Sequence, residues 1–216
     1  MAIAARAPAL PMAYAGAMSE PMPEPILVRP VVLQDALVLL EPLTEDHADA
    51  LLAAMEPDTF VHMATCPADF TPAAVRAYVR DLLARPDQVA FTVRHRPTDR
   101  IIGSTSYMSI RPAHRGLEIG CTWIGSAWRG TGVNAAMKRL MLTHAFETLD
   151  AIRVELRTDA LNARSRRAIE KLGAEQEALF RRHMVMADGR YRDSVVYAIT
   201  DDRWPQVRAG LGHTAT

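Results

Sequence analysis

The segment "SAWRGTGVNAAMKRL", Ser126–Leu140, places an arginine and two glycines directly before an apolar helical pattern. Because glycine is a poor helix former, the stretch Arg129–Gly132 is predicted to be a turn that precedes the helix. Such a turn exposes backbone N–H groups at a helix N-terminus, where the helix dipole favours negative charge. These residue types and their spacing therefore predict a diphosphate site, held by Arg129 and the N–H groups of Gly130–Asn134.

Two common nucleotide-binding motifs do not fit this turn. A P-loop requires a lysine and a serine or threonine after its last glycine, and Val133-Asn134 stand there instead. A dinucleotide fingerprint requires a third glycine where this chain has Ala135, and it belongs near the start of a βαβ series. A bare strand-to-helix connection stays open as the alternative, since a lone G-x-G is a weak signal.

A candidate general base lies one strand length before the turn. Alternation along "GLEIGCTWI" predicts one face with Leu117, Ile119, Cys121 and Trp123, and an opposite face with Glu118, Gly120 and Thr122. A carboxylate in a partly apolar cleft can accept a proton directly or through water. Glu118 is therefore a predicted general base, and a solvated or ion-paired edge glutamate is the alternative.

Composition excludes several classes of partner. The chain of 216 residues carries 25 basic and 25 acidic side chains, which argues against DNA or an anionic membrane as a partner of the whole surface. No apolar run approaches the roughly 18 residues of a membrane span. Cys66 and Cys121 have no metal spacing and form no disulfide framework, which favours a reducing, cytoplasmic compartment and a protein without a metal.

The N-terminal segment is rich in alanine, proline and methionine and has almost no charge. Arg6 and "AYA" suggest a signal peptide, but Pro8 and Pro11 interrupt its apolar part and favour a disordered tail, or an upstream start preceding Met18. The expected organisation is a disordered tail at 1–25, a single domain at 26–210 and a flexible C-terminus at 211–216.

The elements that would position these residues follow the order β-α-α-β-β-β-α-β-α-β-β, an α/β fold with a mixed sheet and helices on its faces. The predicted strands are Leu37–Leu43, Val89–Arg94, Arg100–Ile110, Gly116–Ile124, Ile152–Thr158 and two strands around the turn Asp188-Gly189. The predicted helices are Thr44–Met55, one opened by Thr71-Pro72 and ended by Pro86, Gly132–Leu149, and one opened by Asn162 and closed by Gly173.

The segment "WRGTGVN" resembles the R/Q-x-x-G-x-G/A pyrophosphate loop of the GNAT N-acetyltransferases, in the branch that contains the ribosomal-protein N-terminal acetyltransferases RimJ and RimL. Further segments agree in order and distance: "LEPLTEDHADALL", "IIGSTSY", "LEIGCTWI" and "NARSRRAIEKLGA". The resemblance covers roughly Leu37–Ile199. It implies a splayed central sheet of about seven strands flanked by helices, with the pantetheine of acyl-CoA in the gap.

The resemblance also implies which residues contact acyl-CoA. Pantetheine would pair with the backbone of Trp123 and Ile124, and Asn162 would bind pantetheine or substrate, with Ser165 beside it. The pyrophosphate would lie on Arg129, Gly130, Thr131, Gly132, Val133 and Asn134.

The sequence departs from the family pattern in three places. Asn134 occupies the last small-residue position of the loop, and Ala174 replaces the usual phenylalanine. Ile169 stands where many members have a tyrosine that protonates the departing thiolate. Ser165 is the candidate substitute for that acid, and an ordinary helix-start serine is the alternative.

The predicted function is transfer of an acyl group, most simply acetyl from acetyl-CoA, to a primary amine by direct attack in a ternary complex. The amine belongs to a small molecule or a protein N-terminus, and the loops at 56–70 and 110–116 are expected to shape its pocket. Two alternatives stay open: a non-catalytic acyl-CoA sensor, and an enzyme using succinyl-CoA with a carboxylate contact from Arg111–Arg115. His114 in that loop is a second candidate base or a solvated histidine, and exposed strand edges favour a homodimer.

Overall fold

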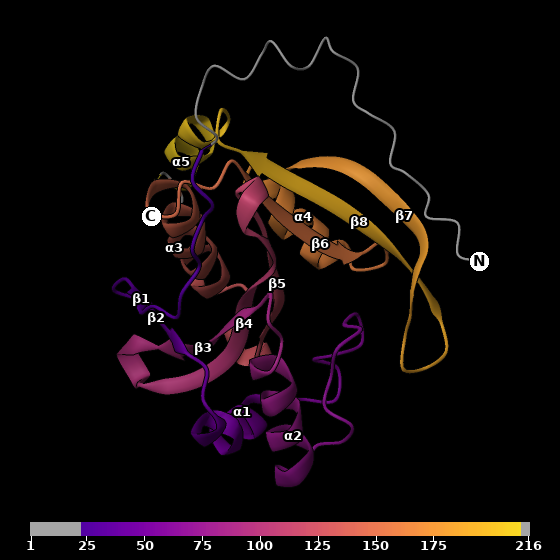
Figure 1. Ribbon diagram of the computed structural model, residues 1–216. Coiled ribbons are helices and arrows are strands. Elements are labelled where there is room, and N and C mark those ends of the chain that lie inside the picture. Colours follow the sequence, from indigo (N-terminus) through magenta and orange to yellow (C-terminus); the bar gives the residue numbers. More distant parts are fainter. Residues whose placement is uncertain (1–22, 213–216) are drawn as a thin grey trace, which may run out of the picture.

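The computed structural model of the protein describes residues 23–212 (Figure 1). Residues 1–22 of the predicted tail and residues 213–216 of the predicted flexible C-terminus lie outside the described residues.

The described chain forms one eight-stranded sheet with the order β1-β2-β3-β4-β5-β6-β8-β7. Neighbouring strands are antiparallel except for the parallel pair β5 and β6. The mixed sheet is confirmed, with the two-residue β1 added to the seven expected strands. The strands are β1 Leu33–Gln34, β2 Val38–Pro42, β3 Val89–His95, β4 Arg100–Arg111, β5 Gly116–Ile124, β6 Arg153–Asp159, β7 Glu175–Val185 and β8 Tyr191–Thr200.

The helices begin where the capping residues predict. Thr71 Oγ1 accepts a hydrogen bond from Ala74 N at 3.3 Å, and Asn162 Oδ1 accepts one from Ser165 N at 3.0 Å. After Thr44 the first turn is a 3-10 helix, so the α-helix begins later than expected, at Ala48. The helices are α1 Ala48–Ala54, α2 Pro72–Leu83, α3 Val133–Glu147, α4 Ala163–Lys171 and α5 Trp204–Gly212, the last without a sequence prediction.

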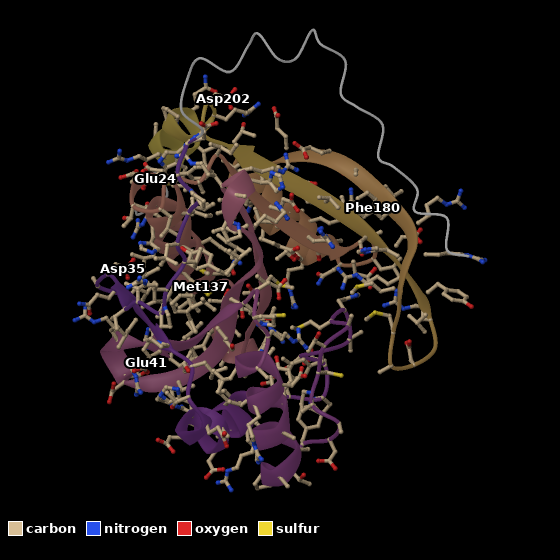
Figure 2. The ribbon with its side chains drawn as sticks, in the orientation of Figure 1. Glu24, Asp35, Glu41, Met137, Phe180 and Asp202 are labelled. Carbon is tan, nitrogen blue, oxygen red and sulfur yellow. The ribbon has the colours of Figure 1, made fainter. Side chains whose placement is uncertain are left out.

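Two hydrophobic clusters hold the helices to the sheet. The larger one includes Met137 and Met141 of α3, and the smaller one joins α1 and α2 to Phe60 and Trp123. In Figure 2, Met137 lies among the packed interior side chains, whereas Phe180 lies out on β7. Each fully buried aliphatic side chain contributes about 1.5–3 kcal/mol, so the clusters fix α3 and the loop after α1 against β5.

The predicted alternation of β5 is wrong beyond Gly120. Ser106 pairs with Gly120 and Ser104 with Trp123, so that Cys121 and Thr122 together lie opposite one residue of β4. This β-bulge places Cys121 at a left-handed φ of 47° and shifts the following side chains to the other face. Trp123 therefore packs in the smaller cluster, whereas Leu117 and Ile119 pack in the larger one.

The splay between β5 and β6 is confirmed. The two strands pair only at Gly116↔Arg153, Leu117↔Val154 and Glu118↔Glu155. Beyond Glu118, β5 continues to Ile124 and β6 to Asp159 without further pairing between the two strands. Backbone groups along this edge of β5 are left to pair with a ligand or with water.

Candidate active site

A cavity of about 370 Å³ lies in the gap between β5 and β6. Its walls come from both strands, from α3 and α4, and from the 58–65 loop that follows α1. Thr131, Gly132 and Val133 of the predicted site do not line it. The predicted site residues that do line it are Glu118, Trp123, Ile124, Arg129, Gly130, Asn134, Asn162 and Ser165.

The turn before α3 has the geometry that its glycines predict. Gly130 and Gly132 take positive φ values of 80° and 88°, which residues with a Cβ rarely adopt. The Thr131 hydroxyl donates a hydrogen bond to Trp128 O at 2.7 Å and so closes the turn. The chain thereby reverses directly in front of α3 and leaves the first helical turn facing the cavity at Asn134.

The N-terminus of α3 differs from those of α2 and α4. Side chains cap α2 and α4, but the N-cap of α3 is Gly132, which provides no side-chain hydrogen bond. The first N–H groups of a helix have no acceptor within the helix, so those of α3 remain available to an anion. This end of the cavity can hold a phosphate group.

Arg129 is held at the same end by two contacts. Its Nε donates to Ile124 O at 3.3 Å, and its Nη1 donates to Asp58 Oδ2 at 3.2 Å. The side chain is only 18% exposed, whereas that of Asp58 is 65% exposed. The guanidinium is thus positioned between the end of β5 and the 58–65 loop before any ligand binds.

Glu118 lies at the other end of the cavity and is only 5% exposed. Its Oε2 is 3.4 Å from Arg157 Nη2 and accepts no hydrogen bond within the described residues. Burial raises the pKa of the Glu118 carboxyl, and Glu155 adds to this effect, while Arg157, Arg192 and Lys138 oppose it. Glu118 is therefore a buried carboxyl facing the cavity and not a solvated one, while its ion pair with Arg157 fits the ion-paired alternative.

Gly120 leaves the room that the Glu118 carboxyl occupies. A Cβ at this position would lie 2.5 Å from Met108 Sδ and 3.1 Å from Glu118 Oε1. Any larger residue would therefore displace Met108 or the carboxyl.

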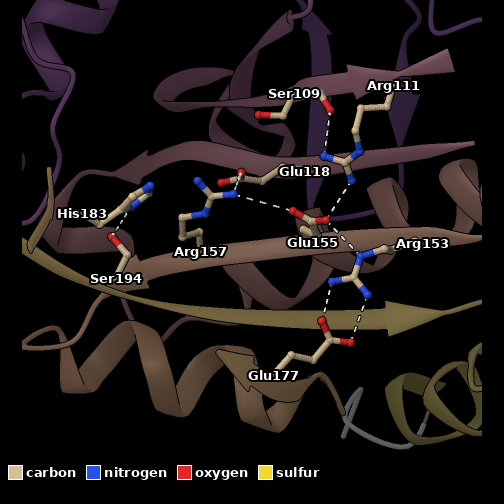
Figure 3. A network of polar contacts seen from close by, with 9 residues as sticks. All are labelled: Ser109, Arg111, Glu118, Arg153, Glu155, Arg157, Glu177, His183 and Ser194. Atoms are coloured by element: carbon tan, nitrogen blue, oxygen red, sulfur yellow. Dashed lines mark hydrogen bonds and ion pairs between the residues drawn. The ribbon is translucent and has the colours of Figure 1, made fainter. Parts of the chain in front are cut away.

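A network of charged side chains surrounds Glu118 (Figure 3). Glu155 accepts hydrogen bonds from Arg111 at 2.8 Å and Arg153 at 2.9 Å, and Arg157 lies 3.7 Å from it. Arg153 also pairs with Glu177. Arg157 is thus shared between Glu118 and Glu155, which holds its guanidinium beside the cavity.

The loop at 110–116 was expected to shape the pocket of the acceptor amine, but its charged residues do not line the cavity. Arg111, His114 and Arg115 are not among the residues that line the cavity, and His114 is exposed. The guanidinium of Arg111 is committed to Glu155. The loop at 58–65 does line the cavity, as expected for part of the predicted 56–70 segment.

A second polar cluster lies beside the cavity, where the 58–65 loop meets the β7–β8 hairpin. Asp159, whose side chain is fully buried, accepts from Arg190 Nη2 at 2.7 Å and lies 3.2 Å from His62 Nδ1. Arg192, which is 7% exposed, donates to His62 O at 3.3 Å, and its Nε has no partner within residues 23–212. Segments about 130 residues apart in sequence therefore meet here.

Sequence reasoning missed several cavity residues, above all Lys138 of α3. Its side chain is 5% exposed, and Nζ lies 2.8 Å from Thr122 Oγ1. Burial lowers the pKa of Lys138 to about 7, and Glu118 and Cys121 oppose the shift. Its position four residues after Asn134, on the same side of the helix, could have identified it.

Ser165 and Ile169 line the cavity on successive positions of one face of α4. Ile169, where the family pattern has a tyrosine, thus reaches the cavity without offering a hydroxyl. Asn162 Oδ1 is occupied by the helix cap, which leaves its amide N–H groups for a ligand.

Over 23–212 no group of three or more histidine, cysteine, aspartate or glutamate side chains is placed to hold a metal ion. None of the helices in that part of the chain combines the length and the apolar character that crossing a membrane requires.

Comparison with known proteins identifies the family to which the chain belongs. Residues 38–175 match the acetyltransferase (GNAT) domain. YdaF of Bacillus subtilis (strain 168), provisionally named a ribosomal N-acetyltransferase, is 30% identical over 104 residues, which cover 48% of this chain and 56% of YdaF. The matched part of the chain thus spans little more than half the length of that relative.

Solved structures extend the likeness over most of the chain. A provisionally named acetyltransferase from T. thermophilus is 34% identical, with a TM-score of 0.83 over 88% of this chain and 100% of the other. RimJ of Mycobacterium smegmatis, solved in complex with CoA-disulfide, is 22% identical with a TM-score of 0.71, over 86% and 93% of the two chains, and shares the fold. The chain belongs to the GNAT family of N-acetyltransferases.

Proposed function

We propose that the protein transfers the acetyl group of acetyl-CoA to a primary amine by direct attack in a ternary complex. The main observation behind this proposal is that one cavity has the N-terminus of α3, which no side chain caps, at one end and the buried carboxyl of Glu118 at the other. Family membership supports the donor, since these enzymes use acetyl-CoA, and RimJ of M. smegmatis is described with CoA-disulfide.

The donor would run along the unpaired edge of β5. Pantetheine amides would pair with the backbone at Trp123 and Ile124, with Asn162 and Ser165 on the opposite wall. The pyrophosphate would lie on Arg129 and Gly130, on the N–H groups of Thr131, Gly132 and Val133, and on Asn134. The helix dipole contributes about 0.3–1 kcal/mol to such binding, and each charge-assisted hydrogen bond from the guanidinium about 1.5–3 kcal/mol.

Glu118 would act as the general base. The amine nitrogen attacks the thioester carbonyl carbon, the C–N bond forms, the C–S bond breaks, and the nitrogen loses a proton to Glu118. Because burial raises the pKa of this carboxyl, it is a stronger base than a solvated glutamate. Ser165, which lines the cavity, stays the sequence-based candidate for returning a proton to sulfur.

The acceptor is a small primary amine or the N-terminus of a protein. Arg157 and Arg192 make its end of the cavity rich in positive charge, although the carboxylates of Glu118 and Glu155 partly balance them. The Arg111–Arg115 contact expected for a succinyl group is not supported, because these residues lie away from the cavity.

A homodimer and a cytoplasmic location are also proposed. β7 is the last strand of the sheet, and its exposed apolar side chains include Leu179, Phe180 and Val185. Such an edge favours pairing with a second copy. Cys66 and Cys121 are unpaired, in keeping with a reducing compartment. Light scattering of the purified protein tests the dimer.

Thermal melting with acetyl-CoA, CoA or succinyl-CoA tests the donor, and thiol release with a panel of amines and N-terminal peptides tests the reaction. A ligand at 100 times its dissociation constant should add about 2.7 kcal/mol of stability. Stabilisation by acetyl-CoA with thiol release supports the proposal. Binding without release for every amine would favour the sensor, faster transfer from succinyl-CoA would favour the other donor, and no binding of any CoA would overturn the proposal.

A further inference from the structure

Lys138 is a buried cation in the middle of the proposed donor site. It projects from α3 one helical turn beyond Asn134, lines the cavity, and reaches Thr122 just past the bulge of β5. Over residues 23–212 no carboxylate forms an ion pair with it. A buried ammonium without a carboxylate partner is costly, so its presence requires an explanation other than stability.

The chain otherwise avoids lysine. Of its 25 basic residues only Lys138 and Lys171 are lysines, and the rest are arginines. Arginine cannot release its proton in a protein, whereas a buried lysine can. The chain therefore keeps a releasable proton at one buried position and uses fixed charge almost everywhere else.

The partner of Lys138 suits both of its charge states. A hydroxyl accepts a hydrogen bond from an ammonium and donates one to a neutral amine. Thr122 Oγ1 also lies 2.8 Å from Thr105 Oγ1 and 3.3 Å from Gly120 O, so it keeps another partner in either orientation. A carboxylate in its place would hold the lysine charged.

We propose that Lys138 is the catalytic acid that protonates the departing CoA thiolate, in place of the tyrosine that the chain lacks at Ile169. This rests on the proposed acetyl transfer, and it assigns to Lys138 the role that sequence reasoning gave to Ser165. Among residues 23–212, the ionisable side chains that act on its charge are Glu118 and Cys121, both on β5.

The proton balance closes within the cavity. The amine forms its C–N bond and gives one proton to the Glu118 carboxylate. The C–S bond breaks, and Lys138 gives one proton to sulfur, which leaves a neutral lysine and a protonated glutamic acid. Transfer of that proton from Glu118 to Lys138, directly or through water, restores both groups, and no other reactant is needed.

Electrostatics support the geometry. Burial lowers the pKa of Lys138 to about 7 and raises that of Glu118, so the two pKa values move toward each other, which favours proton exchange between the two groups. An ammonium poised near neutrality is a far stronger acid than a serine hydroxyl, and general acids work best with a pKa near the working pH.

The first test uses the presence of only two lysines. Protein labelled with ¹³C at lysine Cε should give two NMR signals, and Lys171→Arg, at an exposed position, assigns them. We expect the Lys138 signal to titrate near neutral pH. It should shift further on addition of acetyl-CoA and of CoA. Titration of the Lys138 signal near its ordinary pKa of 10.5 would overturn the proposal.

The second test measures thiol release from acetyl-CoA with hydroxylamine, a small amine that does not depend on the acceptor pocket. Lys138→Met should lower kcat about 100-fold or more and remove the fall in rate at alkaline pH. Lys138→Arg keeps the charge but releases no proton, so it should be equally slow. Lys171→Arg, at an exposed site, should stay within about threefold of the parent protein, and Ser165→Ala should lose less rate than Lys138→Met.

The outcomes separate this inference from the proposed function. If the unaltered protein neither binds acetyl-CoA nor releases thiol, the acetyl transfer itself fails. If it does both, and folded Lys138→Met keeps the parent rate or is faster than Ser165→Ala, the assignment to Lys138 fails. Retained activity in Lys138→Arg would show a fixed charge rather than a proton donor, and would also overturn it.

Discussion

The two ends of the cavity are built in different ways. The phosphate end comes from one continuous segment, in which Ile124, the glycine turn and the start of α3 follow each other within about ten residues. The opposite end gathers Glu118, Arg157, Arg192 and the 58–65 loop from separate elements. Local backbone geometry therefore decides the first end, and tertiary packing decides the second.

The two ends also differ in the kind of charge they offer. Backbone dipoles and one arginine act at the turn, and neither changes with pH. Farther along the cavity, Glu118 and Lys138 are buried ionisable groups whose pKa values are shifted in opposite directions. If the first end binds the donor and these groups transfer protons, as proposed, variants at each place should separate the two roles.

The largest effect is expected from Glu118→Gln, which removes the base but keeps the shape. We expect kcat to fall by about 10²–10⁴-fold, because a general base contributes that much, with little change in the affinity for acetyl-CoA. In the parent protein the rate should rise with pH through the raised pKa of Glu118, and this rise should be lost in the variant. Thiol-release kinetics across pH measure both.

Glu155→Gln is the matched control. Glu155 belongs to the same charged network and binds Arg111 and Arg153, but it does not line the cavity. Its replacement should leave most of the rate intact. Equal losses in the two variants would mean that the network as a whole, rather than Glu118, carries the proton chemistry.

The geometry of the turn before α3 and of the start of α4 could be predicted from the sequence because its signals are local. Glycine at Gly130 and Gly132 marks positive φ, and Asn162 marks a helix start. The splay between β5 and β6 followed from family resemblance, since nothing in the residues of these strands states where their pairing stops.

At the other end Glu118 was predicted, but its surroundings could not be, for two physical reasons. The bulge at Cys121 breaks the alternation of β5 at a residue that is not glycine, so the pattern gives no sign of it. Arg157, Arg192 and His62 meet only through tertiary folding. The spacing of Lys138 from Asn134 indicates a shared side of α3. The burial of Lys138 becomes evident only in the folded structure.

The next largest effect concerns stability. The pKa of Lys138 falls from 10.5 to about 7, and each pH unit corresponds to about 1.4 kcal/mol. Below pH 7 folded and unfolded protein both hold the proton, so the cost of burying the charge is fully present. Between pH 7 and 10.5 the folded state binds fewer protons than the unfolded state, so the cost fades as pH rises.

Lys138→Met should therefore unfold at a higher urea concentration than the parent protein at pH 6, by several kcal/mol in free energy. The gain should shrink as the pH approaches 10. Lys171→Met, at an exposed site, should show no such trend. A gain that grows with pH would contradict the burial of a charged lysine.

A smaller effect is expected from Arg129→Ala at the phosphate end. Loss of a charge-assisted hydrogen bond costs about 1.5–3 kcal/mol, so the dissociation constant of acetyl-CoA should rise about 10- to 100-fold while kcat at saturation changes little. Calorimetry measures the binding. Arg76→Ala removes an exposed ion pair between α2 and Asp49 of α1 and should leave the affinity as it was. A loss of kcat alone in Arg129→Ala would reverse the roles assigned to the two ends.

The smallest effect separates backbone strain from ligand binding at the glycine turn. Gly130 and Gly189 have nearly the same φ, 80° and 81°, and a Cβ at either would meet no atom within 4 Å. Alanine at each should therefore cost about 1–2 kcal/mol of stability from the left-handed conformation alone. Gly130 lines the cavity and Gly189 lies in the β7–β8 turn, so only Gly130→Ala should also weaken acetyl-CoA binding, which melting with and without the ligand would show. Equal ligand-induced stabilisation of the two variants would mean that the turn supports α3 without contacting the donor.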